Sequence, residues 1–304
     1  ELAAGVFAAI ATEGGAAISN SGVIDLGDRA LVFDTFLTPQ AAQDLRVSIE
    51  HTLGKPPKIV INSHYHNDHI WGNQVFEPHS LILASTHTRQ LITTEGLAEF
   101  RYYSANSAQR LAALQQDYQR ADSEQQRTQL ALWLGYYQGL VEALPSLSMC
   151  LPSLTFEHRL TLHGSKRSAE LITFENVHSG SDTILYLQAD GIVFASDLLF
   201  IGSHPYLGEG DPLLVLNALK DLAALTANVF VPGHGPVGTR GDLDLMSEYV
   251  EHCLTTAQSL ATGEEGGTEK SAPLDMPELY KSWHLAQFYP GNIQRLMQRL
   301  SAAQ

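Results

Sequence analysis

The chain has 304 residues, of which 44% are hydrophobic and 17% are charged, with 24 glycines and 13 prolines. This is ordinary globular usage, which excludes a disordered, collagen-like or coiled-coil chain. With 18 Lys and Arg against 33 Asp and Glu, the formal charge of -15 argues against nucleic acid or an anionic membrane surface as the main partner. No apolar run reaches the ~18 residues that a membrane-spanning helix needs.

The first part of the chain predicts short strands followed by a helix. Apolar runs between glycine-containing turns place strands at residues 5–11, 16–20, 22–26 and 30–34. A helix is expected over residues 39–53, because apolar side chains recur at helical spacing and Thr38 precedes Pro39 as a start signal. Two further short buried strands, the second followed by a helix from Thr86, are expected at residues 58–61 and 81–84.

Residues 97–144 are rich in Gln, Ala and Leu and nearly free of Gly and Pro, which predicts two or more helices with a break near residues 122–124. We interpret the stretch at about 97–150 as a helical insertion that packs on the main domain. The alternative is a substrate lid or a homodimerisation arm built from aromatic side chains, namely Tyr102, Tyr103, Trp133, Tyr136 and Tyr137.

The last part of the chain returns to alternating strands and helices. Strands are expected at residues 171–174, 183–188, 192–195 and 229–231. Helices are expected at residues 212–225, 243–260 and 292–300, and the segment 263–267 predicts a surface loop. This pattern indicates a single α/β domain over residues 1–304.

Three histidines and one aspartate lie within six residues, directly after the buried strand at 58–61. Alternate residues of an extended chain point to the same side, so His64 and His66 can bind one metal ion. Asp68 and His69 are adjacent and diverge, which suits a second metal ion close to the first. Imidazole with carboxylate is a zinc-type ligand set, with iron and manganese as alternatives.

Each later strand end offers one further ligand. His178 follows the strand at 171–174, Asp197 ends the strand at 192–195, and His234 ends the strand at 229–231. Glycines beside His178 and His234 permit a close approach of the backbone. These positions predict one site, built from loops at one edge of a sheet.

The order of an HxHxDH motif, a histidine in HSGSDT, an aspartate in ASDLLF and a histidine in PGHG resembles the metallo-β-lactamase superfamily. The bridging aspartate resembles that of its hydroxyacylglutathione hydrolases, the glyoxalase II enzymes, and of its lactonases. The resemblance implies a four-layer αββα sandwich with the metal ions at one edge between the sheets. The ligand roles that it implies are His64, His66 and His178 for the first ion, Asp68, His69 and His234 for the second ion, and Asp197 as the bridge.

These ligands imply two divalent ions, Zn²⁺ in the first place and Fe or Mn otherwise, that hold a bridging hydroxide at neutral pH. The expected function is the hydrolysis of an ester, thioester, lactone or lactam bond in a small-molecule substrate. Asp68 would orient the nucleophile, and His204 and Tyr206, in the loop after Asp197, would donate hydrogen bonds to the substrate. The alternatives are a β-lactamase-like or phosphodiesterase activity, a mononuclear iron dioxygenase or persulfide enzyme, and a non-catalytic metal-binding scaffold.

Single residues argue against some of the enzyme classes within the superfamily. Asp197 argues against the zinc-cysteine β-lactamases, which carry Cys there, and His66 argues against the flavodiiron oxygen reductases, which carry Glu there. An apolar slot above the metal ions would favour lipid-like or aromatic esters and lactones, whereas a cationic rim would favour phosphates. The expected compartment is the cytoplasm, or the periplasm or exterior if a leader preceded Glu1.

Overall fold

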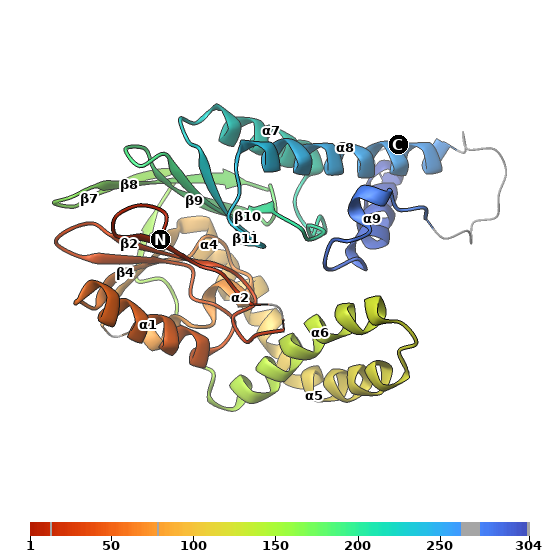
Figure 1. The fold of residues 1–304 in the computed structure, drawn as a ribbon, viewed down its shortest axis with the longest axis horizontal. Helices are drawn as coiled ribbons and strands as arrows, with labels where there is room; N and C mark the ends of the chain where they lie inside the picture. Colours follow the sequence, from red (N-terminus) through yellow and green to blue (C-terminus); the bar gives the residue numbers. More distant parts are fainter. Residues whose placement is uncertain (13, 78, 263–273, 303–304) are drawn as a thin grey trace.

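The computed structural model describes residues 1–12, 14–77, 79–262 and 274–302. Two β-sheets lie face to face in these residues, and helices cover their outer faces (Figure 1). The first sheet has the strand order β1-β2-β3-β4-β5-β6. Its strands are β1 (Val6–Ala9), β2 (Ser21–Asp25), β3 (Ala30–Phe33), β4 (Pro57–Ile61), β5 (Leu81–Ser85) and β6 (Leu154–Phe156).

The second sheet has the order β11-β10-β9-β8-β7, in which only β10 and β11 pair in parallel. Its strands are β7 (Arg159–His163), β8 (Ser168–Glu175), β9 (Ser181–Leu187), β10 (Ile192–Phe200) and β11 (Val229–His234). The inner faces of the two sheets share one apolar core, where the rings of Phe33 and Phe194 lie 6.2 Å apart.

Helices on the two outer faces complete four layers. Helix α1 (Pro39–Leu53) begins at Thr38, whose side chain accepts a hydrogen bond from the Ala41 N–H at 3.2 Å, and packs its apolar face on the first sheet. Helices α7 (Pro212–Ala224) and α8 (Arg240–Thr262) pack on the second sheet. The predicted αββα sandwich is therefore confirmed.

The predicted helical segment forms an antiparallel hairpin of α5 (Leu97–Arg120) and α6 (Glu124–Ala143), which projects at one end of the sandwich (Figure 1). Helix α4 (Thr86–Leu91) and a π-helical turn, η1 (Ile92–Gly96), lead into the hairpin. Helix α6 of this hairpin also contacts the segment that precedes α9 (Phe288–Ala302). There the Gln129 side-chain amide donates a hydrogen bond to the Trp283 carbonyl at 3.3 Å. The homodimerisation arm stays a prediction. The remaining short elements are α2 (Asn67–Ile70), α3 (Asn73–Phe76), η2 (Leu144–Ser146) and η3 (Glu278–Tyr280).

The strand predicted at residues 16–20 is wrong. The backbone of Ile18 has a φ of 69°, which no strand permits, and the Ser19 hydroxyl and Asn20 amide donate to the backbone carbonyls of Asp68 in α2 and Pro232 in β11. Strands β6 and β7 were not predicted, because both are short and largely exposed at sheet edges. The loop predicted at 263–267 lies outside the described residues. Within the described part of the chain, no helix has the length and apolarity to cross a membrane.

Candidate metal centre

The structure gathers all seven predicted ligand side chains at one edge of the two sheets. The loop after β4 and the short helix α2 supply the HxHxDH residues, and the β8–β9 loop, β10 and the end of β11 supply the others. They form two neighbouring groups. One contains His64, His66, His178 and Asp197, and the other contains Asp68, His69 and His234.

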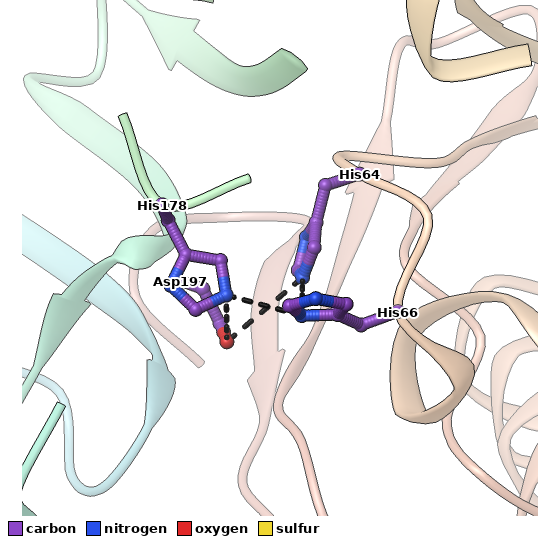
Figure 2. A group of neighbouring side chains, drawn as sticks. All are labelled: His64, His66, His178 and Asp197. Carbon is purple, nitrogen blue, oxygen red and sulfur yellow. Dashed lines mark hydrogen bonds and ion pairs between the residues drawn. The ribbon is translucent and has the colours of Figure 1, made fainter. Parts of the chain in front are cut away.

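The first group converges on a common point (Figure 2). Nδ1 of His66 lies 3.0 Å from Nε2 of His64 and 3.1 Å from Nε2 of His178. Oδ2 of Asp197 lies 3.2 Å from Nε2 of His178 and 3.9 Å from Nε2 of His64. Ligand atoms about 2.0–2.1 Å from a tetrahedral zinc ion lie about 3.3 Å from one another, so these spacings fit one ion.

The second group meets the other oxygen of the same aspartate. Oδ1 of Asp197 lies 3.1 Å from Nε2 of His69 and 3.4 Å from Nε2 of His234. Oδ2 of Asp68 lies 3.4 Å from Nε2 of His234 and 3.7 Å from Nε2 of His69. Asp197 therefore stands between the two groups and turns one oxygen to each.

Two buried atoms at the centre of the cluster indicate that a cation belongs there. Nε2 of His69 and Oδ1 of Asp197 are covered from solvent and have no hydrogen-bond partner with acceptable geometry among the described residues. Buried polar atoms are rarely left without a partner, and a metal ion would satisfy both at once. Burial and the neighbouring imidazoles also hold the pKa of His64 well below its usual range, so this ring is neutral and ready to bind a cation.

Asp34 fixes the orientation of His69. Its carboxylate is buried, lies 2.8 Å from Nδ1 of His69, and accepts hydrogen bonds from the Ser63 N–H at 2.8 Å and hydroxyl at 2.7 Å. A carboxylate on one ring nitrogen directs the lone pair of the other nitrogen toward the metal. A fourth contact comes from the Ser196 hydroxyl at 3.0 Å.

The backbone around Asp197 is shaped for close approach. The register of β10 against β11 shifts at Ser196, whose φ of 48° lies in the left-handed region. Such a bulge re-aims the following side chain, and it points Asp197 into the cluster. Gly233 has no tolerance for a side chain, because a Cβ there would lie 1.8 Å from Oδ1 of Asp197.

Glu209 is a site residue that the sequence did not single out. Its Oε1 lies 3.2 Å from Nε2 of His66, and its Oε2 accepts a hydrogen bond from the Tyr65 hydroxyl at 2.8 Å. Burial lowers the pKa of His66, but the hydrogen bond and charge of Glu209 outweigh it and raise the pKa to about 9. Glu209 thus holds the ring with Nδ1 toward the cluster. An acidic residue in the loop after Asp197 was the signal that could have identified it.

The two residues predicted to contact the substrate, Tyr206 and His204, lie in different environments. Tyr206 lines the cavity in front of the ligands, and its ring centroid lies 6.3 Å from those of His66 and His178. His204 is fully buried, with Nδ1 2.9 Å from the Tyr249 hydroxyl and Nε2 3.1 Å from the Tyr280 carbonyl. The structure therefore places His204 in the packing under the C-terminal segment, outside the residues that line the cavity.

A cavity of about 830 Å³ opens above the two groups. Its walls come from the segment before β2, the α5–α6 hairpin, the loop after β10 and the start of α9. Its aromatic lining residues are Tyr103, Trp133, Tyr136, Phe200, Tyr206 and Phe288. None of the described residues that line it is a lysine or an arginine. The described cavity wall thus combines aromatic side chains with carboxylates, and it lies in front of the candidate metal ligands.

An αββα sandwich that carries a histidine and aspartate cluster at one sheet edge defines the class of metal-dependent, hydrolase-like proteins. A comparison with known families gives the particular one. The profile of the metallo-beta-lactamase superfamily matches residues 14–234, and the chain belongs to this superfamily.

Solved structures with the same fold include several metallo-beta-lactamases. The enzyme from Pontibacter korlensis is 18% identical, with a TM-score of 0.54 over 77% of this chain and 87% of that chain. The enzyme from Hirschia baltica is 13% identical, with a TM-score of 0.52 over 76% of this chain and 85% of that one. FIM-1 from Pseudomonas aeruginosa, solved in a mono-zinc form, is 16% identical, with a TM-score of 0.53 over 77% and 84%. These similarities show the fold.

Proposed function

We propose that this protein is a binuclear metal-dependent hydrolase that cleaves an acyl bond, in an ester, thioester, lactone or lactam. The observation that carries the proposal is the position of Asp197, which offers Oδ2 to one ligand group and Oδ1 to the other. One carboxylate shared between two adjacent groups is the arrangement that holds two ions close together. Zinc is the ion proposed, which agrees with the histidine-rich donor set and with the zinc in FIM-1.

When bound, two divalent ions supply a nucleophilic water at neutral pH and polarise the carbonyl oxygen under attack. The chain's own residues then orient the reactants. Asp68 lines the cavity beside His234, and its Oδ2 faces the second ligand group, so the other oxygen, Oδ1, would hold the attacking water and accept its proton. Burial raises the pKa of Tyr206, so its hydroxyl keeps its proton at neutral pH and can donate it in a hydrogen bond to the substrate.

The lining of the cavity favours acyl bonds over phosphate esters. A phosphate substrate carries negative charge that the metal ions do not fully neutralise, and proteins usually bind the remaining charge with Lys or Arg. The described lining residues include neither, and they include Glu99 and Glu209 instead. The aromatic walls suit an apolar or aromatic substrate body.

The test is elemental analysis of the purified protein together with a panel of chromogenic esters, thioesters, lactones, a cephalosporin and phosphodiesters. We expect two ions per chain and turnover of an acyl substrate. His66→Ala and Asp197→Ala should each lower the metal content and reduce kcat/KM by about 10³-fold or more, because each removes a donor from the cluster. His163→Ala, at an exposed position of β7, is the matched control and should change neither.

Two results would contradict the proposal. Full metal loading without turnover of any panel member would indicate a binding scaffold. One iron per chain, with the second ligand group insensitive to substitution, would indicate mononuclear iron chemistry.

A further inference from the structure

Glu99 brings an unpaired carboxylate oxygen into the metal cavity. The residue lies near the start of α5 and lines the cavity together with Asn67 and Asp68 of α2. Its Oε2 atom is covered from solvent and has no hydrogen-bond partner among the described residues. A buried carboxylate oxygen without a donor is costly, so this atom points to a donor that arrives with a ligand.

Several aromatic rings line the same cavity as Glu99. Tyr103 lies one turn further along α5, on the same face, and its ring centroid lies 5.8 Å from that of Tyr136. The ring of Trp133 lies 5.7 Å from that of Tyr136 and 6.1 Å from that of Phe288. A cavity that combines aromatic rings with a carboxylate favours a cationic group over an anionic one.

The other carboxylate on this side of the cavity is already occupied. Both oxygens of Glu209 are held, one by His66 and the other by the Tyr65 hydroxyl. No lysine or arginine occurs among the described residues of the cavity wall to neutralise Glu99. His66, the cationic neighbour that acts on Glu99, is already held by Glu209, so the described wall offers Glu99 no cation of its own.

We propose that the substrate carries a positively charged nitrogen group on an aromatic or apolar body, and that Glu99 receives this group while the scissile acyl bond lies over the metal cluster. The inference rests on the proposed hydrolase function and adds its substrate class. It also gives the α5–α6 hairpin a role, because the hairpin supplies Glu99 and three of the aromatic rings.

The test is a matched series of aryl esters whose acyl chains are of equal length and end in an ammonium group, a methyl group or a carboxylate. With the metal-loaded protein, kcat/KM should be at least tenfold higher for the ammonium ester than for the methyl ester, and lowest for the carboxylate ester. Equal rates for the ammonium and methyl esters, or a preference for the carboxylate, would overturn the inference. Absence of turnover across the series would instead count against the hydrolase function.

Two variants test whether Glu99 is the source of the preference for the ammonium ester. In Glu99→Gln, which keeps the size of the side chain, the ratio of kcat/KM between the ammonium and methyl esters should fall about tenfold. Glu95→Gln removes the same charge from an exposed position one turn earlier and should leave the ratio as in the wild type. An equal fall in both variants would assign the preference to general charge and contradict a specific role of Glu99.

A binding measurement separates recognition from catalysis. Calorimetric titration of the metal-loaded protein with benzylammonium and with benzyl alcohol should show tighter binding of the cation, and Glu99→Gln should remove most of the difference. Circular dichroism and metal analysis of the variant check that the fold and the cluster are intact. Equal affinity of the wild type for the two probes would contradict the inference even if no ester were turned over.

Discussion

Replacement of Asp34 by Asn tests whether this buried carboxylate prepares His69 to bind metal. The carboxylate is contacted by the Ser63 N–H, two hydroxyl groups and Nδ1 of His69 at 2.8 Å. In Asp34→Asn one oxygen becomes an amide group that donates. The backbone N–H of Ser63 keeps an acceptor, and the two hydroxyls can turn to accept. Only the His69 contact becomes unfavourable, because two donors then face each other.

The expected cost is therefore that of about one hydrogen bond to a charged group, about 1.5–3 kcal/mol. His69 can avoid the clash by moving its proton to Nε2, but that nitrogen is the one that faces Asp197 at 3.1 Å and would bind the ion. Either way, metal affinity should fall about 10–100-fold, the usual effect of removing a partner that orients a histidine ligand.

Competition with a chromophoric chelator measures this affinity directly. The control is Asp25→Asn, which changes another buried aspartate of the first sheet, one that is paired with Lys55 and Lys166. It should lower the free energy of unfolding and leave metal affinity unchanged. If folded Asp34→Asn bound zinc within twofold of the wild type, the reasoning about the His69 ring would be refuted.

Three further results are expected. Phe194→Ala removes a fully buried ring between the sheets and should lower the free energy of unfolding by about 3–5 kcal/mol in denaturant titration. A loss below about 1 kcal/mol would contradict the packing of this ring in the core between the sheets. His204→Ala should lower the free energy of unfolding by about 2–4 kcal/mol and leave the metal content unchanged. A fall in metal content would indicate that His204 takes part in the metal site after all. The two lysines outweigh the opposing effect of burial and lower the pKa of Asp25 from 3.8 to about 2. Its contribution to stability is therefore present above about pH 4 and lost as the pH falls toward 2, so Asp25→Asn should flatten the acid limb of a urea-midpoint profile, and an unchanged limb would argue against the ion pairs.

Local sequence signals were sufficient to single out the candidate ligands that the structure brings together. Ligands that lie two residues apart after a buried strand, or at the end of another strand, have their directions set by strand geometry alone. His64, His66 and His234 could therefore be assigned before any tertiary contact was known. The helices were predicted well for a similar reason, because caps such as Thr38 and the apolar spacing that follows are properties of neighbouring residues.

Residues that act across the fold gave no such signal. The contact between Glu209 and His66 joins positions 143 residues apart in the chain. Glu99 reaches the cavity only because the α5–α6 hairpin packs against α2, where the Asn67 side-chain amide donates a hydrogen bond to the Tyr136 hydroxyl at 2.8 Å. His204 shows the converse, since its place in the loop after Asp197 suggested a substrate contact, but the packing of Tyr249 and Tyr280 turned it inward.

The sequence by itself thus predicted the candidate ligands and the helical segment from short-range spacing and periodicity, and it predicted the αββα class through its resemblance to the metallo-β-lactamase superfamily. Only the tertiary structure decided that Asp197 presents one oxygen to each ligand group, and that the cavity is aromatic and acidic. The physical reason is that ligand directions follow from the local backbone, whereas the lining of a cavity depends on which distant elements pack beside one another.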